Sequence, residues 1–253
     1  MLAHRFGPLL DAVWLERRQR FLLDVALADG TRLTAHCPNT GAMTGLTRPD
    51  ARVLLSRAAN PKRRLAYTLE AVEADGVWVG ANTQNPNRVA LALARAGHAP
   101  LPASIAVRPE VRYGTAERVD LLLTGPDGRR TFVEVKNVHL VERAGEASFP
   151  DCVTLRGAKH LAALAHVVAE GERAMMLFLI QRHDCEVFRL ARHIDPAYAA
   201  AFDAAAAAGV AMVALRCRVD REGITAERTI PVLDLATGRA EAAALPTAAL
   251  GPT

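Results

Sequence analysis

One stretch of the chain constrains its fold more than any other: residues 131–138, with the sequence TFVEVKNV. Apolar and polar side chains alternate there with a period of two, which is typical of a strand with one buried face. A second strand-like run at residues 118–123 precedes it, and the turn sequence Gly-Pro-Asp-Gly lies between the two. These features predict a β-hairpin, and folding it back brings Asp120 next to Glu134 and Lys136.

This set of two carboxylates and one amine suits a divalent cation held against a phosphodiester. Asp and Glu oxygens are good ligands for Mg²⁺, which keeps several waters and takes few protein ligands. We expect Asp120 and Glu134 to bind Mg²⁺ or Mn²⁺, and Lys136 to orient the attacking water or to stabilise negative charge on the phosphate. Glu110, shortly before the hairpin, is a further candidate for a catalytic carboxylate.

A simpler interpretation of the same residues stays open. A Glu-x-Lys pair on one strand face is commonly a solvated salt bridge without a chemical role. Lysine usage adds weight to the chemical role, because only Lys62, Lys136 and Lys159 among the 31 basic residues are lysines, and each lies in a motif of interest. Arginine is planar and always charged, whereas lysine is compact with a movable pKa, so a site that needs an amine resists replacement by arginine.

The composition is that of a folded protein, which we expect in the cytoplasm without membrane association. At 253 residues, with 51% hydrophobic and 23% charged residues, the chain suffices for one large domain or two ordinary ones. No apolar run approaches the roughly 20 residues that cross a bilayer, and the first residues lack the long apolar core of a signal peptide. The four cysteines are scattered without a Cys-x-x-Cys pair, so we expect neither a zinc site nor a disulfide framework.

The net charge of +4 is unevenly distributed along the chain. Residues 1–102 contain 13 Lys and Arg against 8 Asp and Glu, whereas residues 103–253 contain 18 against 19. An electrostatic attraction to nucleic acid would therefore favour the first part, although basic surfaces are common and the charge alone is weak support.

Residues 1–102 are expected to form the first domain. Short strands follow one another closely and predict a small closed β-barrel, of which the OB-like barrel is the best candidate. A short helix is expected at residues 87–96, and Pro100-Leu101-Pro102 marks the boundary. The predicted strands are residues 9–16, 21–28, 31–37, 53–55, 66–72 and 77–80.

Two basic stretches and one Asn-containing loop of this domain are candidate nucleic-acid contacts. Arginine and lysine would pair with phosphates, and an asparagine amide or the N–H groups of its loop would donate to them. The alternatives, ordinary solvated loops and an Asx turn at the asparagine, stay open. The candidates are Arg18, Arg20, Asn39, Lys62, Arg63 and Arg64.

Residues 103–235 are expected to form a second domain in which helices and strands alternate as an α/β layer. Residues 140–148 should form a charged, mobile loop between its elements, and the Ala-, Gly- and Pro-rich residues 236–253 a flexible tail. The predicted elements are helices 155–170 and 196–208 and strands 174–180 and 210–218.

Arg156, Lys159 and His160 lie near the start of the first of these helices. Positive groups at a helix N-terminus oppose the helix dipole, so they suggest an anion nearby, such as a DNA phosphate. Arg118, two residues before Asp120, is a further candidate for such a contact. The alternative is that these are solvated charges on a helix and a strand.

Several motifs together resemble the sugar fermentation stimulation protein A (SfsA) family. The resemblance covers nearly the whole chain, from Arg20 to Val232, and its departures are small: His139 and Cys152 replace a usual Thr and Ala, and Glu117 a usual Ser. None of these changes removes a carboxylate or the lysine. The motifs are HCPNTGAM at 36–43, VEVKNV at 133–138, FPD at 149–151 and RGAKHL at 156–161.

The resemblance implies an α+β protein with an N-terminal OB-like β-barrel followed by an α/β nuclease-like domain of the PD-(D/E)xK type. Asp120 would fill the acidic position of that motif, and Glu134 and Lys136 the E-x-K. It also implies a DNA-binding regulator of sugar, notably maltose, metabolism that retains a Mg²⁺-dependent site. We expect double-stranded DNA with low sequence specificity. An active metal-dependent DNA endonuclease or phosphodiesterase is the alternative, and both a monomer and a homodimer stay open.

Overall fold

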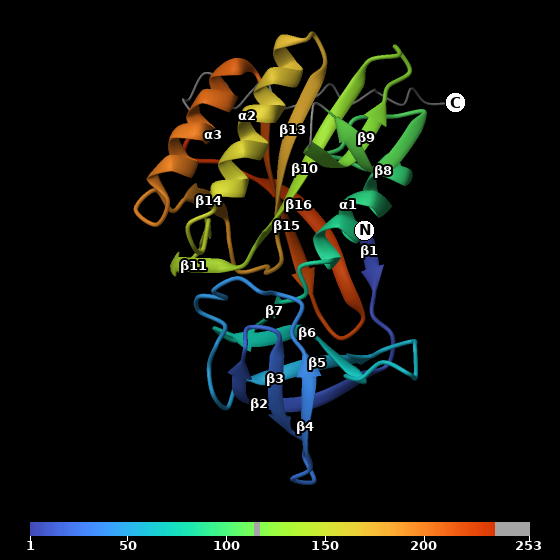
Figure 1. Ribbon diagram of the computed structural model, residues 1–253, viewed down its shortest axis with the longest axis vertical. Coiled ribbons are helices and arrows are strands. Elements are labelled where there is room, and N and C mark those ends of the chain that lie inside the picture. The colour runs from blue at the N-terminus through green and yellow to red at the C-terminus, as the bar shows by residue number, and fades with distance from the viewer. Residues whose placement is uncertain (114–116, 236–253) are drawn as a thin grey trace, which may run out of the picture.

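Two large β-sheets organise the protein, whose computed structural model describes residues 1–113 and 117–235. A six-stranded sheet lies in the lower part of Figure 1, and a seven-stranded sheet with helices packed on it lies in the upper part. The predicted flexible tail, residues 236–253, lies outside the described residues. None of the helices in the described ranges is long and apolar enough to cross a membrane.

The six-stranded sheet has the order β4-β3-β2-β5-β6-β7 and is closed by a further pairing of β4 with β6. In that pairing His36 lies beside Thr68 in parallel. Gly30 takes a φ of 82° in the turn between β3 and β4, which favours glycine, so the Asp-Gly hairpin is confirmed. The strands are β2 (Leu9–Arg18), β3 (Leu22–Ala26), β4 (Arg32–His36), β5 (Arg52–Arg57), β6 (Tyr67–Ala74) and β7 (Val77–Gly80).

The seven-stranded sheet has the order β1-β16-β15-β13-β10-β9-β8. Its central pairs β10–β13 and β13–β15 are parallel, and the pairs on both sides are antiparallel. The parallel centre is buried on both faces, and β13 is accordingly an almost continuous apolar run. The strands are β1 (Leu2–Arg5), β8 (Ala106–Tyr113), β9 (Glu117–Thr124), β10 (Arg130–Val138), β13 (Arg173–Ile180), β15 (Ala211–Val219) and β16 (Gly223–Ile230).

Helices cover both faces of the larger sheet. On one face α2 and α3 pack side by side (Figure 1), and Leu161 of α2 shares a core with Phe178 of β13. On the opposite face α1 packs through Val89 into a second core that contains Leu177. The adjacent residues of β13 thus point to different helices, as strand geometry requires. The helices are α1 (Asn85–Arg95), α2 (Leu155–Ala169) and α3 (Pro196–Ala208).

Two elements that lie inside residues 1–102 pack on the larger sheet. β1 pairs antiparallel with β16, where Leu2 lies beside Thr225. α1 contributes its buried face to the core beneath β10 and β13. The division at residue 102 remains a prediction about folding units, and the hydrogen bonding shows that the chain begins on the larger sheet before it enters the barrel.

Residues 140–148 form a hairpin and not the charged, mobile loop that their composition predicts. β11 (Leu140–Arg143) pairs antiparallel with β12 (Glu146–Phe149), and β12 pairs in parallel with β14 (Val187–Leu190). Leu140 and Ala147 are 4% and 0% exposed, so apolar contacts fix the hairpin although charged residues alternate with them. The composition misleads because only one face of the hairpin is solvated.

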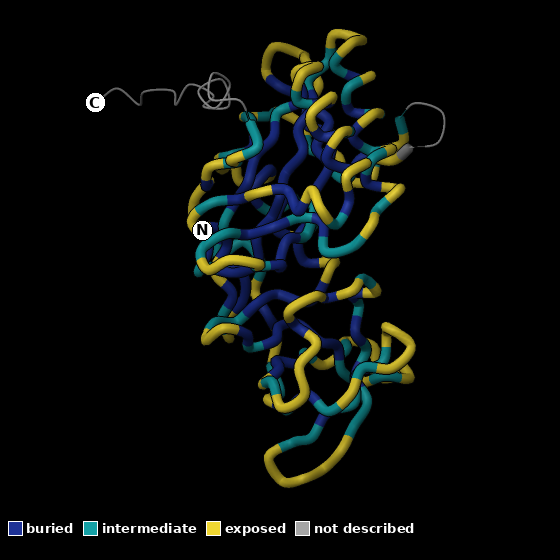
Figure 2. The backbone as a smooth tube through the Cα atoms, turned by 90° about the vertical axis from the view of Figure 1, so that its left-hand side faces the viewer, coloured by how far each residue is buried: buried dark blue, intermediate teal, exposed yellow. Residues whose placement is uncertain are grey.

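The two large sheets meet at a polar junction. The N–H of Gly80 donates to the carbonyl of Gln181 at 2.9 Å, and the N–H of Met43 donates to Asp151 Oδ2 at 3.0 Å. In Figure 2 the buried segments gather inside the layers of the larger sheet, and the exposed ones lie in the outer loops. The barrel loop that contains Met43 is therefore held by a side chain of the FPD motif, which lies at the end of β12.

Candidate metal and nucleic-acid site

The hairpin predicted for β9 and β10 is confirmed. The strands pair from Arg130 beside Thr124 to Val133 beside Leu121, so the next positions in this register are Glu134 and Asp120. The two carboxylates are thus brought to one place on the sheet by the pairing of neighbouring strands.

Asp120 is fixed by two hydrogen bonds where β9 and β10 adjoin. Its Oδ2 accepts the backbone N–H of Val135 at 2.7 Å, so the side chain binds the main chain of the adjacent strand. Its Oδ1 accepts from the amide of Asn87 on α1, also at 2.7 Å. Asn87 is not among the site residues predicted from the sequence, so its role beside Asp120 is a finding of the structure.

Glu134 is buried beneath two donors. Its Oε1 accepts from Lys136 Nζ at 2.7 Å and contacts Nδ1 of His160 on α2. The other ring nitrogen of His160, Nε2, lies 3.2 Å from Nε of Arg156. We assign the tautomer with the hydrogen on Nδ1, since only this one donates to Glu134 and accepts from Arg156.

The pKa values of the two carboxylates reflect their burial and the charges around them. Burial raises the pKa of Asp120 to about 6, and the negative charge of Glu134 adds to the rise. Burial also acts to raise the pKa of Glu134, but the hydrogen bond with His160 and the charge of Lys136 outweigh it and hold that pKa below its ordinary value. The site therefore contains one firmly ionised carboxylate beside a second that its neighbour makes harder to ionise.

The donor set fits a divalent cation that takes few protein ligands. Asp120 and Glu134 supply hard oxygen atoms, and a cation between them would relieve the repulsion that raises the pKa of Asp120. Within residues 1–113 and 117–235 there is no group of three or more His, Cys, Asp or Glu side chains arranged for a metal. Two carboxylates with waters and a substrate phosphate suit Mg²⁺ or Mn²⁺ and do not suit zinc.

Glu110 lies on β8 at the position across from Asp120, between the pairs Pro109–Leu121 and Val111–Val119. Its φ of 55° places its backbone in the left-handed region, which interrupts the regular strand. Its exposed carboxylate pairs with Arg118 at 3.2 Å. The two predicted residues Glu110 and Arg118 thus form an ion pair at the rim of the site, and their roles stay predictions.

The basic residues predicted near the helix N-terminus lie at the same place. Arg156 and Lys159 are exposed on the first turns of α2, and His160 reaches into the site. Thr154 caps this helix by accepting the N–H of Gly157 at 3.1 Å. The first turn of α2 contains no acidic residue that would neutralise the two cations.

The side chains predicted to contact nucleic acid on the barrel differ in whether they are already held by other residues. Arg18 pairs with Asp24 at 2.6 Å, and Arg63 donates to Thr68 at 2.9 Å. Asn39 is 4% exposed and its side chain accepts the N–H of Gly41 at 2.9 Å, which is the Asx turn left open by the sequence. The five basic candidates, Arg18, Arg20, Lys62, Arg63 and Arg64, are all exposed, and their nucleic-acid contacts stay predictions.

Replacing Asp120 by Asn is expected to stabilise the metal-free protein by about 2 to 3 kcal/mol at pH 7 and to raise its Tm by roughly 5–10 °C. The folded protein holds a proton on Asp120 up to pH about 6, whereas an unfolded aspartate loses it around pH 3.8. Wild-type stability is therefore lost as pH rises from the unfolded to the folded pKa, and Asp120→Asn avoids that loss. Thermal unfolding in EDTA at several pH values measures the difference.

The pH profile separates this effect from a general gain in packing. The advantage of Asp120→Asn should shrink toward zero as the pH falls below 3.8, where the aspartate becomes protonated in folded and unfolded protein alike. Asp127→Asn is the matched control, because the pKa of the exposed Asp127 is lowered by its hydrogen bond with Arg173 and its replacement should not stabilise. An advantage of Asp120→Asn that is equal at all pH values would contradict the assignment.

Known proteins and family models match this chain along almost its whole length. The family model described as the sugar fermentation stimulation protein RE domain matches residues 84–223, and the SfsA N-terminal OB domain matches residues 15–81. A sugar fermentation stimulation protein homolog of Rhodospirillum centenum is 51% identical over 224 residues, which cover 88% of this chain and 96% of the relative. The homolog of Methylobacterium radiotolerans is 50% identical over 232 residues, covering 90% and 97%.

A solved structure confirms the fold. The structure of Pyrococcus furiosus SfsA in complex with Ca²⁺ is similar with a TM-score of 0.83 and 24% sequence identity, over 92% of this chain and 99% of that one. The prediction of an OB-like β-barrel followed by an α/β nuclease-like domain is therefore confirmed.

Proposed function

This chain belongs to the sugar fermentation stimulation protein (SfsA) family, and we propose that it is a DNA-binding protein with a Mg²⁺-dependent phosphodiesterase site on its larger sheet. The observation on which this rests is the convergence of Asp120, Glu134 and Lys136 where β9 and β10 adjoin. The coupling between the two carboxylates and the 2.7 Å contact of Lys136 with Glu134 support a chemical role over an exposed salt bridge. Glu134 is 3% exposed, so the solvated interpretation does not fit its surroundings.

The proposed metal ligands are Asp120 and Glu134. When bound, the cation would lower the pKa of a water and stabilise charge on the scissile phosphate. Ca²⁺ and Mg²⁺ both take oxygen ligands, and the Pyrococcus furiosus relative was solved in complex with Ca²⁺. This agrees with a divalent cation here and leaves the choice of Mg²⁺ or Mn²⁺ to experiment.

The other side chains of the site have positioning and charge-stabilising roles in this proposal. Asn87 and the N–H of Val135 fix both oxygens of Asp120. His160 holds one oxygen of Glu134 and is itself held by Arg156. The Lys136 amine, already beside Glu134, is the group that would orient the attacking water or meet the negative charge of the phosphate.

The proposed DNA contacts extend from this site toward the barrel. Arg156 and Lys159 project from the first turns of α2 and would grip the phosphates beside the cleaved bond. Burial raises the pKa of the Cys152 thiol, and the nearby charge of Arg20 acts against that rise, so the β2–β3 turn of the barrel lies near the loop before α2. A course from Arg20 to Lys159 is therefore the proposed path of the DNA backbone.

A second function is a regulator of sugar, notably maltose, metabolism that binds DNA and uses the nuclease-like domain only as a scaffold. The observation in its favour is the engagement of Glu134 by Lys136 and His160, which a metal would have to share. Such a regulator would bind DNA without a metal, and its affinity would fall steeply with salt because phosphate contacts dominate.

The proposal is tested by incubating the purified protein with supercoiled plasmid, duplex and single-stranded oligonucleotides, and RNA. We expect cleavage of DNA with Mg²⁺ or Mn²⁺, none with EDTA, and binding at low salt in both cases. Glu134→Gln, which keeps the size of the side chain and removes its charge, controls for a contaminating nuclease and should be inactive.

Two results would decide against the phosphodiesterase. DNA left intact at every metal concentration, together with metal-independent binding, would favour the regulator. Cleavage that persists unchanged in Glu134→Gln would show that the activity belongs to another protein in the preparation.

A further inference from the structure

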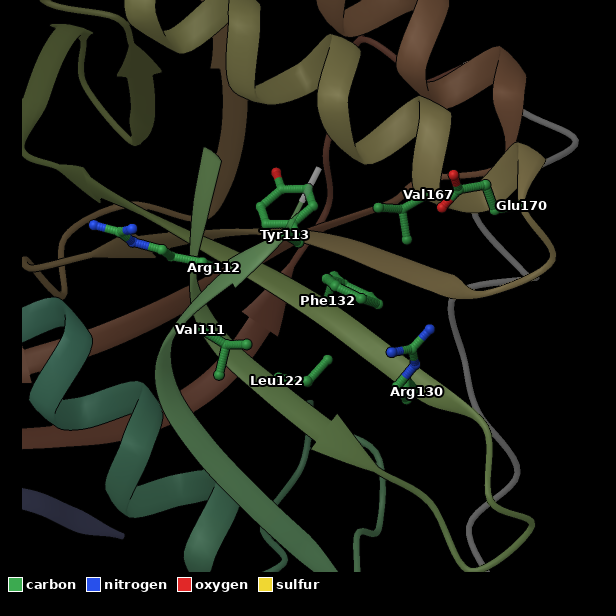
Figure 3. A pocket seen from close by; sticks show the side chains of 8 residues that line it. All are labelled: Val111, Arg112, Tyr113, Leu122, Arg130, Phe132, Val167 and Glu170. Carbon is green, nitrogen blue, oxygen red and sulfur yellow. The ribbon is translucent and has the colours of Figure 1, made fainter. Parts of the chain in front are cut away.

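A pocket of about 220 Å³ lies on the α2 face of the larger sheet, beside the proposed metal site. Its apolar lining comes from β8, β9, β10 and α2, and Figure 3 shows Tyr113 and Phe132 close together with Val167 of the helix beside them. The residues used below are Val111, Tyr113, Leu122, Arg130, Phe132 and Val167.

The pocket and the site are built from the same strands. Phe132 precedes Glu134 by two residues on β10 and therefore faces the same side, about 7 Å away along the strand. Leu122 follows Asp120 by two residues on β9. A group bound in the pocket is thus about one strand repeat from a phosphate held between the two carboxylates.

Helix α2 also contributes one residue to the site and one to the pocket. Val167, which lines the pocket, follows His160 by seven residues, or about two turns of α2, so both lie on one stripe of the helix. His160 covers Glu134, and Val167 covers the part of β10 near Phe132. Site and pocket therefore lie one after the other along the same strands, with the buried Leu164 of α2 between His160 and Val167 on that stripe.

The side chains that line the pocket suit a planar aromatic ligand with polar edges. The rings of Tyr113 and Phe132 lie 5.4 Å apart at 54°, and Val111, Leu122 and Val167 complete the apolar wall. At the rim, the Arg130 guanidinium lies 5.5 Å from the centre of the Phe132 ring and is held by Glu172 at 2.7 Å. Apolar walls and a few fixed polar groups are the usual make-up of a small-molecule site, and this volume is small for one.

We propose that this pocket receives one unpaired base of the nucleic-acid strand whose phosphate lies at Asp120 and Glu134. The inference rests on the proposed function. A base presents a flat π-face to the apolar wall and donors and acceptors to the rim, and stacking on aromatic side chains accepts every base. The covalent link between base and phosphate matches the adjacency of pocket and site.

This base site narrows the substrate class. A base inside a duplex is not available to a pocket beneath α2, so the strand must be single or locally unpaired, or the base must leave the stack at some cost. The protein should then prefer single strands, bulges or mismatches to a perfect duplex, which replaces the double-stranded preference expected from the sequence.

The test uses oligonucleotides with 2-aminopurine at successive positions, mixed with the full-length protein in EDTA so that no cleavage is needed. Binding is followed by anisotropy and stacking by the emission of 2-aminopurine. We expect emission to change at one unpaired position, and Tyr113→Leu and the pocket-filling Val167→Phe to suppress that change and to weaken single-strand binding about tenfold.

Tyr67→Leu is the matched control, since Tyr67 is a partly buried tyrosine at the start of β6 in the barrel. Its loss should leave the emission change intact, and circular dichroism should show that all variants are folded. DNA that binds without any emission change, or a change that only Tyr67→Leu removes, would overturn the base pocket and leave the proposed function standing. No binding of any DNA would instead refute the proposed function.

A free nucleotide offers the same base without the strand. The fluorescent nucleotide 2-aminopurine riboside monophosphate is therefore titrated alone in the same buffer. Binding at least as tight as that of the oligonucleotide would overturn the assignment to a base within a strand, and much weaker binding is the result we expect.

Discussion

Replacing Lys136 by Ala should lower the rate of DNA cleavage by about 10² to 10³-fold, with little effect on DNA affinity. The amine lies 2.7 Å from Glu134 Oε1 and its side chain is 15% exposed, so it is held inside the site and is available to a substrate. Its proposed work, to orient water and meet developing negative charge, is done only as the reaction proceeds. Loss of such a group lowers kcat and leaves binding of the ground state largely unchanged.

Lys159→Ala is the matched comparison for this variant. Lys159 is exposed on α2 and is proposed to grip a phosphate, so its loss should raise KM, reduce the salt dependence of binding and spare the rate at saturation. Single-turnover cleavage at saturating protein, with anisotropy for affinity, separates the two effects.

Lys136→Arg sharpens the test, since the planar, bulkier guanidinium keeps the charge without the compact amine. We expect it to be almost as inactive as Lys136→Ala. Full activity of Lys136→Arg would mean that charge alone suffices there, and full activity of Lys136→Ala would remove the lysine from the mechanism.

The hairpin could be predicted from the sequence because it is local. A period of two in residues 131–138 and a Gly-Pro-Asp-Gly turn fix which residues of β9 and β10 can be neighbours. The unusual lysine usage pointed to Lys136, whose amine contacts Glu134, and to Lys159, the neighbour of His160 on α2. The alternation of residues indicates local strand geometry, and the retention of lysine indicates a position where an amine is required.

What could not be predicted depends on contacts between distant parts of the chain. Asn87 and Asp120 are 33 residues apart and meet only because α1 returns to the larger sheet. β1 pairs with β16, which lies more than 200 residues later in the chain. Its four residues, three partly buried and one exposed, give no local sign of this pairing. The hairpin of β11 and β12 was hidden because its charged residues conceal a buried face.

Arg182, at the junction between the barrel and the larger sheet, is a further residue whose role depends on contacts with distant parts of the chain. Arg182 follows β13 and is 2% exposed, although nothing in the local sequence marks it as buried. Its guanidinium donates to Asp184 at 2.6 Å and to the carbonyl of His139 at 3.2 Å. It also reaches Asp75 in the β6–β7 turn of the barrel at 3.0 Å. The neighbouring carboxylates raise the pKa of Arg182 despite its burial, so the charge stays fixed at the junction.

Replacing Arg182 by Ala should lower the free energy of unfolding by about 3 to 5 kcal/mol, because it leaves its partners without a donor and opens a space between the sheets. For a chain of this size that corresponds to a fall in Tm of roughly 6–20 °C. Urea and thermal unfolding followed by circular dichroism measure the loss. Since Arg182 joins the barrel to the larger sheet, limited proteolysis should also cut near the junction sooner than in the wild type.

Arg189→Ala is the control that shows whether burial is the cause. Arg189 also pairs with an acid, Glu146, at 3.2 Å, but its side chain is 44% exposed. Surface pairs of this kind contribute about 0 to 1 kcal/mol, so its loss should hardly change Tm. Equal effects of Arg189→Ala and Arg182→Ala would mean that the buried arginine does not hold the junction. The barrel and the larger sheet would then depend on backbone contacts such as that of Gly80 with Gln181 to stay together.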